Sequence, residues 1–142
     1  PRLSTVNRIL EVLTERRGPR CKDIMTSEVI YVKPDATVKE VSELMTRYAI
    51  DQVPVIDEHG RVIGTVTDRG IVKNLSPELA NENVEKVMEP PMPTVPEDTS
   101  VAKVKFLLEE YPGVLVTRGK DIVGIITRAD LIKTLSSPLE VE

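Results

Sequence analysis

The chain has 142 residues, of which 40% are hydrophobic and 30% charged, with a formal net charge of −4. This composition is typical of a folded globular protein made of one compact domain or two small halves. The negative charge and the 3% aromatic content argue against general nucleic-acid binding, and no apolar run reaches the roughly 18 residues that span a membrane. The single cysteine, Cys21, excludes an internal disulfide and favours a reducing, cytoplasmic location.

Residues 1–20 are predicted to form a helix that acts as a linker before the rest of the chain. Ser4 is a candidate N-cap, and Gly18 follows the expected end of the helix. Four apolar residues lie at the spacing of one helical face, namely Val6, Ile9, Leu10 and Leu13. Because the chain begins at Pro1 rather than Met, we expect a fragment of a longer enzyme or a processed product.

A first repeat is predicted over residues 21–75. Its expected elements are a short strand, a helix, two strands joined by a turn and a closing helix, over residues 29–32, 37–48, 53–56, 61–66 and 67–75. Thr37 and Glu40 have the spacing of a capping box at the start of the first helix. The turn at 57–60 ends in glycine, which is typical of a hairpin.

A second repeat is predicted over residues 84–135, after a linker at 76–83 and before a tail at 136–142. The helix face Val38, Val41, Leu44, Met45 and Tyr48 recurs 63 residues later as Val101, Val104, Leu107, Leu108 and Tyr111. The turn Gly64-Thr-Val-Thr67 recurs 60 residues later as Gly124-Ile-Ile-Thr127. Each copy, of about 50–55 residues, is too small to bury a sizeable core alone, so we expect the copies to pack together.

The turn at the end of the second repeat joins a strand to a helix and brings chemistry-bearing groups to one place. Thr127 is a candidate N-cap, and Asp130 follows in the first helical turn. A carboxylate there is suited to accept hydrogen bonds from two ribose hydroxyls, and a helix N-terminus favours a phosphate. The alternative interpretation is a plain strand-to-helix turn with a cap.

These features together resemble a tandem pair of cystathionine-β-synthase (CBS) domains, a Bateman module, over residues 21–135. The resemblance rests on the repeat order and on four motifs: Met25-Thr26, Val53-Pro-Val-Ile-Asp-Glu-His-Gly60, Val87-Met-Glu-Pro90 and the two Gly-x-x-Thr turns. It implies an α/β (α+β) fold of two β-α-β-β-α repeats packed by pseudo-twofold symmetry. It also implies two clefts for adenosyl ligands such as AMP, ATP or S-adenosylmethionine, and pairing of two modules into a disc-shaped homodimer.

A narrower resemblance is to the C-terminal regulatory part of cystathionine β-synthase-like enzymes. It rests on Leu13-Thr-Glu15, Asp23-Ile-Met25, the run from Val87 to Val95, and Val114-Leu-Val-Thr-Arg-Gly119. This resemblance implies S-adenosylmethionine as the ligand and an attached or partner enzyme as the regulated target.

The family resemblance assigns the ligand of the second cleft to the turn and to nearby strands. This resemblance implies that Asp130 lines an open cleft and accepts hydrogen bonds from the ribose hydroxyls. It also implies that Thr127 faces the phosphate side of the ligand. Arg128 either meets a phosphate or faces solvent. The adenine slot is expected to be formed by Met92, Thr94, Val95, Gly113, Val114 and Leu115. For Met92 and Val114, plain core packing is the alternative.

The first repeat departs from the family pattern, because Gly70 stands where the carboxylate is expected. Asp68 lies two residues too early, about 200° away around a helix, so it does not simply substitute. We therefore expect the first cleft to bind a nucleoside weakly or not at all, with Arg69 attracting a simple anion. Its expected residues are Val29, Ile30, Gln52, Val53, Thr67 and Arg69.

The sequence thus favours a non-enzymatic module that senses an adenosyl ligand, requires no cofactor and forms a homodimer. No catalytic residues are assigned, and no metal site is expected, since the only histidine, His59, lies in the hairpin turn far from Cys21. One rival hypothesis is a structural dimerisation module whose clefts stay empty. The other is a nucleic-acid-binding protein that uses Arg16, Arg17 and Arg20.

Overall fold

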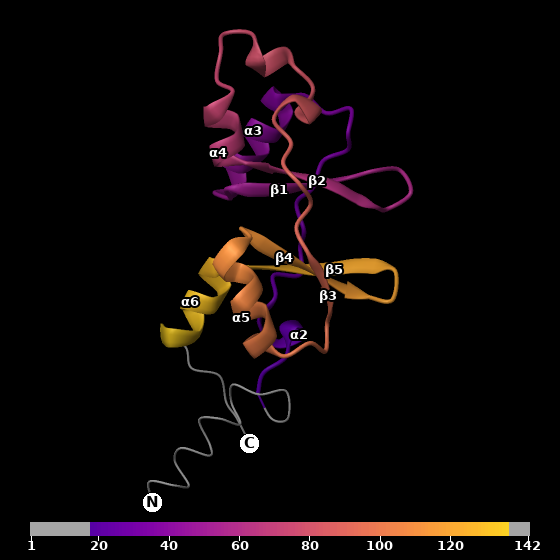
Figure 1. Ribbon diagram of the computed structural model, residues 1–142, viewed down its shortest axis with the longest axis vertical. Helices are drawn as coiled ribbons and strands as arrows, with labels where there is room; N and C mark the ends of the chain where they lie inside the picture. Colours follow the sequence, from indigo (N-terminus) through magenta and orange to yellow (C-terminus); the bar gives the residue numbers. More distant parts are fainter. Residues whose placement is uncertain (1–17, 137–142) are drawn as a thin grey trace, which may run out of the picture. The chain divides into compact units, whose positions relative to one another are not determined.

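The computed structural model describes residues 18–136 and divides them into two compact units (Figure 1). One unit consists of residues 18–29 and 93–136, and the other of residues 30–92. Each unit combines a small sheet with helices, which confirms the predicted mixed α/β fold class. The predicted helix face from Val6 to Leu13 lies outside the described residues, as does nearly all of the predicted tail.

The unit of residues 30–92 is built on an antiparallel hairpin with helices on one side of it (Figure 1). Val53 pairs with Val66 across the hairpin, and both pack in the core with Val41, each fully buried. The apolar helix face predicted from the sequence therefore packs in this core through Val38, Val41, Leu44 and Met45, whereas its fifth residue, Tyr48, is 45% exposed. The elements are α3 (Val38–Tyr48), β1 (Gln52–Ile56), β2 (Val62–Thr67), α4 (Asp68–Lys73), η1 (Leu79–Asn81) and η2 (Val84–Lys86).

The hairpin turn of this unit is confirmed, as is the hydroxyl half of the predicted capping box. The Thr37 hydroxyl accepts a hydrogen bond from the backbone N–H of Glu40 at 3.1 Å and so caps α3. In the hairpin turn, Asp57 Oδ1 accepts from the backbone N–H groups of His59 and Arg61, each at 2.9 Å. Gly60 supplies the positive φ of 80° that the turn requires.

Two predictions for this unit are only partly correct. The strand expected over residues 29–32 is reduced to one parallel bridge between Val32 and Val55. The linker expected at 76–83 contains η1, and its Leu79 is 4% exposed within the hydrophobic core. A single apolar side chain in a polar stretch gives no periodic signal, but the core buries it because apolar area is gained.

The second unit has a three-stranded sheet in the order β3-β4-β5, with its helices on one side of it (Figure 1). β3 runs parallel to β4, and β4 runs antiparallel to β5. Val104 and Leu108 of the long helix pack against Val114, Val116 and Ile126 of the sheet. The elements are α2 (Cys21–Ile24), β3 (Thr94–Pro96), α5 (Val101–Glu110), β4 (Gly113–Arg118), β5 (Asp121–Thr127) and α6 (Arg128–Ser136).

Each unit takes up the segment that begins the other repeat in the sequence. Thr26 exchanges two backbone hydrogen bonds with Ile125, each at 2.9 Å, and Glu89 exchanges two with Thr65, at 2.8 and 2.9 Å. These bonds occupy backbone groups on β5 and β2 that the hairpins leave unpaired. We refer to residues 21–26 and 84–89 as the exchanged segments. The compact units therefore differ from the sequence repeats.

The exchanged segments also explain the glycine of each Gly-x-x-Thr turn. A Cβ atom on Gly124 would collide with the side chain of Met25, and one on Gly64 would collide with Met88. Both methionines pack at the edge of the core of their unit. The Met and Gly positions that mark the repeats in the sequence are thus contact partners. Within residues 18–136, no helix has both the length and the apolar character needed to cross a membrane.

Candidate functional site

The structure brings the predicted Thr127 and Asp130 together with Thr26, which sequence reasoning missed. Asp130 is 8% exposed, and its carboxylate accepts three hydrogen bonds. Oδ2 accepts from the Thr127 backbone N–H at 2.8 Å and from the Thr127 hydroxyl at 3.4 Å, while Oδ1 accepts from the Thr26 hydroxyl at 3.2 Å. A carboxylate, two hydroxyls and the start of α6 therefore form one cluster.

Two expectations about this cluster need correction. Thr127 was expected to close the first turn with its hydroxyl, but that hydroxyl donates to Asp130, whose carboxylate in turn receives the Thr127 N–H. This is the carboxylate half of a capping box, with the acidic residue at the third helical position. Asp130 was also expected to line an open cleft, yet it is buried because it holds the exchanged segment through Thr26. The signal for Thr26 was the Met-Thr pair, whose partner lies in the other repeat.

Arg128 has a structural partner. Its Nε donates to the backbone carbonyl of Leu108 at 2.7 Å, in the last turn of α5. The last carbonyls of a helix have no partner within that helix, so this bond satisfies one of them. Arg128 thereby ties the start of α6 to the end of α5.

The residues predicted for the adenine slot lie on the adjacent strands β3 and β4, except for Met92, which lies two residues before β3. Thr94 of β3 is exposed and pairs with Leu115 of β4, whereas Gly113, Val114 and Leu115 are all buried. Val114 packs in the hydrophobic core of its unit, which was the alternative interpretation for this residue. Met92 is 3% exposed and is the last residue of the other unit, and Val95 is half-buried next to the core.

In the first repeat, the corresponding turn has Thr67 as a helix cap. The Thr67 hydroxyl accepts from the Gly70 backbone N–H at 2.9 Å and both residues are buried. Arg69, which was expected to attract an anion, already lies beside a carboxylate: its Nη2 is 3.7 Å from Oε1 of Glu89. Sequence reasoning did not assign Glu89 to this site, because Glu89 belongs to the second repeat in the sequence.

The other first-cleft residues are distributed over the two units. Gln52 and Val53 are buried on β1, opposite Thr67 and Val66 of β2. Ile30 begins the same unit, whereas Val29 ends the first part of the other unit. Asp68 is exposed at the first position of α4, where its Oδ1 accepts from the Arg69 backbone N–H at 2.7 Å. This position matches a first-turn charge that favours the helix dipole.

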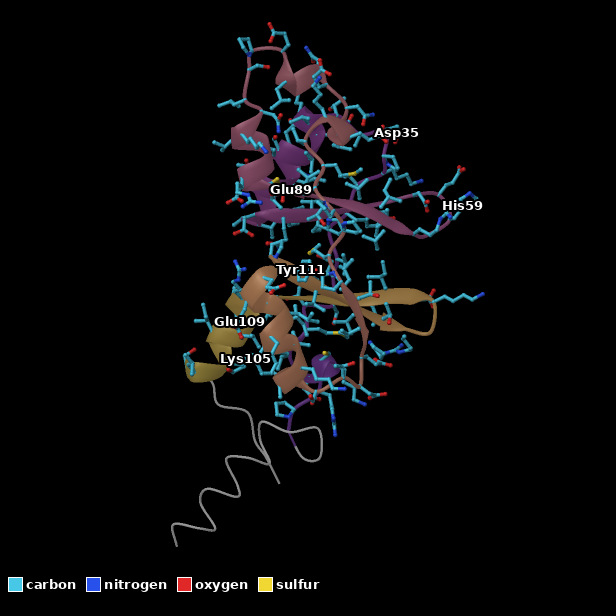
Figure 2. All side chains as sticks on the ribbon, in the orientation of Figure 1. Asp35, His59, Glu89, Lys105, Glu109 and Tyr111 are labelled. Atoms are coloured by element: carbon cyan, nitrogen blue, oxygen red, sulfur yellow. The ribbon has the colours of Figure 1, made fainter. Side chains whose placement is uncertain are left out.

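Metal-binding groups do not converge within residues 18–136, where no three His, Cys, Asp or Glu side chains are placed to hold an ion. His59 lies at the tip of the hairpin, where Figure 2 labels it, with its Nε2 3.6 Å from the Glu58 carboxylate. Cys21 is buried, and burial raises the pKa of its thiol to about 11. A thiol with this pKa stays protonated near neutral pH and is a poor metal ligand and nucleophile.

A groove of about 570 Å³ lies on the surface of the unit of residues 30–92. It is lined by α3, α4 and the region of η1, including Val38, Ile71 and Leu75. None of the predicted binding residues lines it. The groove is therefore distinct from the Thr67 and Arg69 region and is a feature of the helical face.

A comparison with known protein families gives one match, to the CBS domain, over residues 21–77 and again over residues 84–137. The chain is 34% identical over 142 residues to the methylated protein MJ0556 of Methanocaldococcus jannaschii, covering 90% of this chain and 80% of that protein. It is 29% identical over 130 residues to the zinc metalloprotease MJ0392 of the same organism, covering 92% of this chain but only 36% of that protein.

Solved structures resemble the fold over most of its length. The CBS domain pair of protein MJ0100, solved in complex with 5′-methylthioadenosine and S-adenosyl-L-methionine, superposes with a TM-score of 0.73 at 26% identity. The match covers 85% of this chain and 98% of that one.

Proposed function

The chain belongs to the family of CBS-domain proteins, and we propose from this premise that it is a non-catalytic regulatory module that binds an adenosyl ligand. The observation that carries the proposal is the Asp130 carboxylate, 8% exposed and grouped with Thr26 and Thr127 at the end of β5. In the related CBS pair of MJ0100, the bound molecules are both adenosyl compounds.

The carboxylate has limited spare capacity for hydrogen bonds, and this sets how a ribose would bind. An ionised carboxylate offers about four acceptor positions, and three of those on Asp130 are in use. A ribose has two neighbouring hydroxyl donors, so it takes the remaining position and displaces one existing hydroxyl. The Thr26 bond at 3.2 Å and the Thr127 hydroxyl bond at 3.4 Å are both longer than the Thr127 N–H bond and are the ones exchanged.

This exchange couples the ligand to the protein. When a ribose hydroxyl replaces the Thr26 hydroxyl, the exchanged segment 21–26 loses its side-chain hydrogen bond to α6. Coupling free energies of this kind are typically about 1–3 kcal/mol. The regulated target is an attached or partner protein; the metalloprotease relative, of which this chain matches 36%, is an example of a longer protein with such a region.

The proposal includes a homodimer formed through the helices. Four large apolar residues are exposed at equivalent positions of the two repeats, 60 residues apart: Val72 and Leu75 of the first, Ile132 and Leu135 of the second, between 64% and 82% exposed. Val72 lies on α4 and Leu75 follows that helix, while Ile132 and Leu135 lie on α6. Exposed apolar residues of this kind favour a protein partner, and a second copy offers the same residues in return. The groove beside α4 adjoins Leu75.

Isothermal titration calorimetry tests the function with S-adenosylmethionine, 5′-methylthioadenosine, AMP and ATP. Asp130→Asn keeps the shape of the side chain but removes its charge, and it should weaken binding about tenfold to a hundredfold, since a hydrogen bond to a charged group contributes about 1.5–3 kcal/mol. Asp68→Asn is the matched control, as Asp68 is an exposed carboxylate on the equivalent turn. Unchanged affinity in Asp130→Asn would contradict the assignment. Absence of binding by the unaltered protein would favour the rival structural module with empty clefts.

A further inference from the structure

The exchanged segments place Thr26 and Glu89 at equivalent positions in the two units. Thr26 pairs with Ile125, and Glu89 pairs with Thr65, through the same pattern of two backbone hydrogen bonds. Residue numbers differ by 63 between the segment positions and by 60 between the strand positions, which are the shifts that relate the two repeats. The methionine before each position covers the equivalent glycine. The equivalence therefore comes from backbone register.

The polar groups at these equivalent positions are inverted. In one unit the exchanged segment supplies a hydroxyl, from Thr26, and the helix supplies the carboxylate of Asp130. In the other unit the exchanged segment supplies the carboxylate of Glu89, and the helix has Gly70. A Cβ atom placed on Gly70 would lie 3.3 Å from Glu89 Oε2, so the Glu89 carboxylate occupies the region that an aspartate at position 70 would reach. In each unit, a carboxylate thus lies at or beside the third residue of the helix that follows the hairpin, from Asp130 in α6 and from Glu89 next to Gly70 in α4.

From this inversion we propose that Glu89 is the ligand-binding carboxylate of the first cleft, accepting the ribose hydroxyls of an adenosyl ligand. The inference rests on the proposed function and extends it from one adenosyl site per chain to two. Gly70 is then part of the arrangement, because a side chain at that position would meet Glu89 and would lie 2.9 Å from the Val87 carbonyl oxygen.

The Glu89 carboxylate has acceptor capacity to spare. Within residues 18–136, its side-chain contact is with Arg69, at 3.7 Å, and the Arg69 side chain is 84% exposed. Ion pairs of this length and exposure are weak, so a ribose can approach without breaking a strong bond. Asp130, by contrast, already accepts three hydrogen bonds. Figure 2 shows Glu89 beside α4, and its side chain is 29% exposed.

A second observation points to a polar ligand in the same unit. The Thr65 hydroxyl is buried and has no hydrogen-bond partner within the described residues, although buried hydroxyls rarely lack one. Thr65 is the strand residue that pairs with Glu89, and its side chain shares a face of β2 with Thr67, two residues on. The equivalent residue of the other repeat is Ile125, which has no such group. At this position of the sheet, the first unit therefore has a buried hydroxyl without a partner where the second unit has an apolar side chain; the buried Ser100 hydroxyl of the second unit lies elsewhere, at the start of α5.

The test counts ligands by calorimetry on the full chain with S-adenosylmethionine, 5′-methylthioadenosine and AMP. The variants are Asp130→Asn, Glu89→Gln and the two combined, with Glu85→Gln as a matched control, since Glu85 is an exposed glutamate in the same exchanged segment. We expect two ligands per chain for the unaltered protein and one for Asp130→Asn. The remaining site should weaken at least tenfold when Glu89→Gln is added and should be unchanged by Glu85→Gln. Circular dichroism and urea unfolding check that each variant is folded.

The outcomes separate this inference from the proposed function. One ligand per chain that Asp130→Asn alone abolishes would leave the proposed function standing and overturn the role of Glu89. A site that persists in Asp130→Asn and ignores Glu89→Gln would also overturn it. Loss of the only site through Glu89→Gln would support Glu89 and remove Asp130 as the primary carboxylate. No binding of any of the three ligands would overturn both.

Discussion

The hydroxyl of Thr26 donates a hydrogen bond to Asp130 Oδ1 at 3.2 Å, although 104 residues separate the two in the sequence. This bond fastens the first exchanged segment to the start of α6. Thr26→Val keeps the side-chain shape but removes the donor, so it should lower the free energy of unfolding by about 1–2 kcal/mol. Urea unfolding measures this, with Thr46→Val, an exposed position on α3, as the control.

The same substitution separates stability from binding. If a ribose hydroxyl takes the place of the Thr26 hydroxyl, Thr26→Val should bind the adenosyl ligand at least as tightly as the unaltered protein while being less stable. A variant that is weakened equally in both properties would mean that Thr26 contacts the ligand itself.

Asp130→Ala should destabilise the fold as well as weaken ligand binding. The substitution removes the acceptor for Thr26 and for the Thr127 N–H in a nearly buried place, which we expect to lower the free energy of unfolding by about 2–3 kcal/mol. Asp68→Ala, at an exposed position, should change it by less than about 0.5 kcal/mol. Equal stability of the two variants in urea would show that the Asp130 hydrogen bonds contribute little.

Gly64→Ala should be destabilising because of the exchanged segment. The new methyl group meets the Met88 side chain, and overpacking of this kind typically costs about 1–3 kcal/mol. Met88→Ala removes the obstacle, so the double variant should lose less stability than the sum of the two single variants. Thermal unfolding of all four proteins gives this coupling directly. Simple additivity would mean that residues 84–89 do not pack on β2 in solution.

Cys21 should be unreactive, and its thiol should make the free energy of unfolding depend on pH in the alkaline range. Burial raises the pKa of its thiol to about 11, so the folded protein keeps a proton that the unfolded chain releases above its ordinary pKa of 9.0. Unfolding therefore releases a proton between about pH 9 and pH 11, and the free energy of unfolding falls as pH rises through that range. Cys21→Ala should remove this part of the pH dependence. Rapid alkylation of the folded protein at pH 8 would contradict the burial.

Leu75→Lys and Leu135→Lys should convert the proposed homodimer to a monomer without unfolding it. Both leucines are exposed on or beyond the last helix of their repeat, at 71% and 82%, so a charge costs little in the monomer and much in an apolar interface. Light scattering at micromolar concentration should give twice 15.8 kDa for the unaltered protein. His59→Lys, which adds charge in the exposed hairpin turn, is the control and should stay dimeric. A monomeric unaltered protein would rule out this interface.

Much of the local structure follows from the sequence alone. The cap of Thr37 on α3, the hairpin turn with Gly60 and the apolar faces of α3 and α5 each depend on residues a few positions apart, so local spacing encodes them. The repeat itself, with Thr127 and Asp130 at one turn, was also visible, because repetition of a spacing is independent of the way the copies pack.

Only the tertiary structure decided which segment each sheet uses at its edge. The hydrogen bonds that join Thr26 to Ile125 and Glu89 to Thr65 are between backbone groups, so no side-chain pattern in the sequence predicts them. The bonded residues also lie far apart in the sequence. Repeat symmetry identifies Asp130 and Gly70 as equivalent but says nothing of a carboxylate brought to Gly70 from another segment. The apparent loss of an acidic group in the first repeat was therefore visible in the sequence, whereas its replacement by Glu89 required the fold.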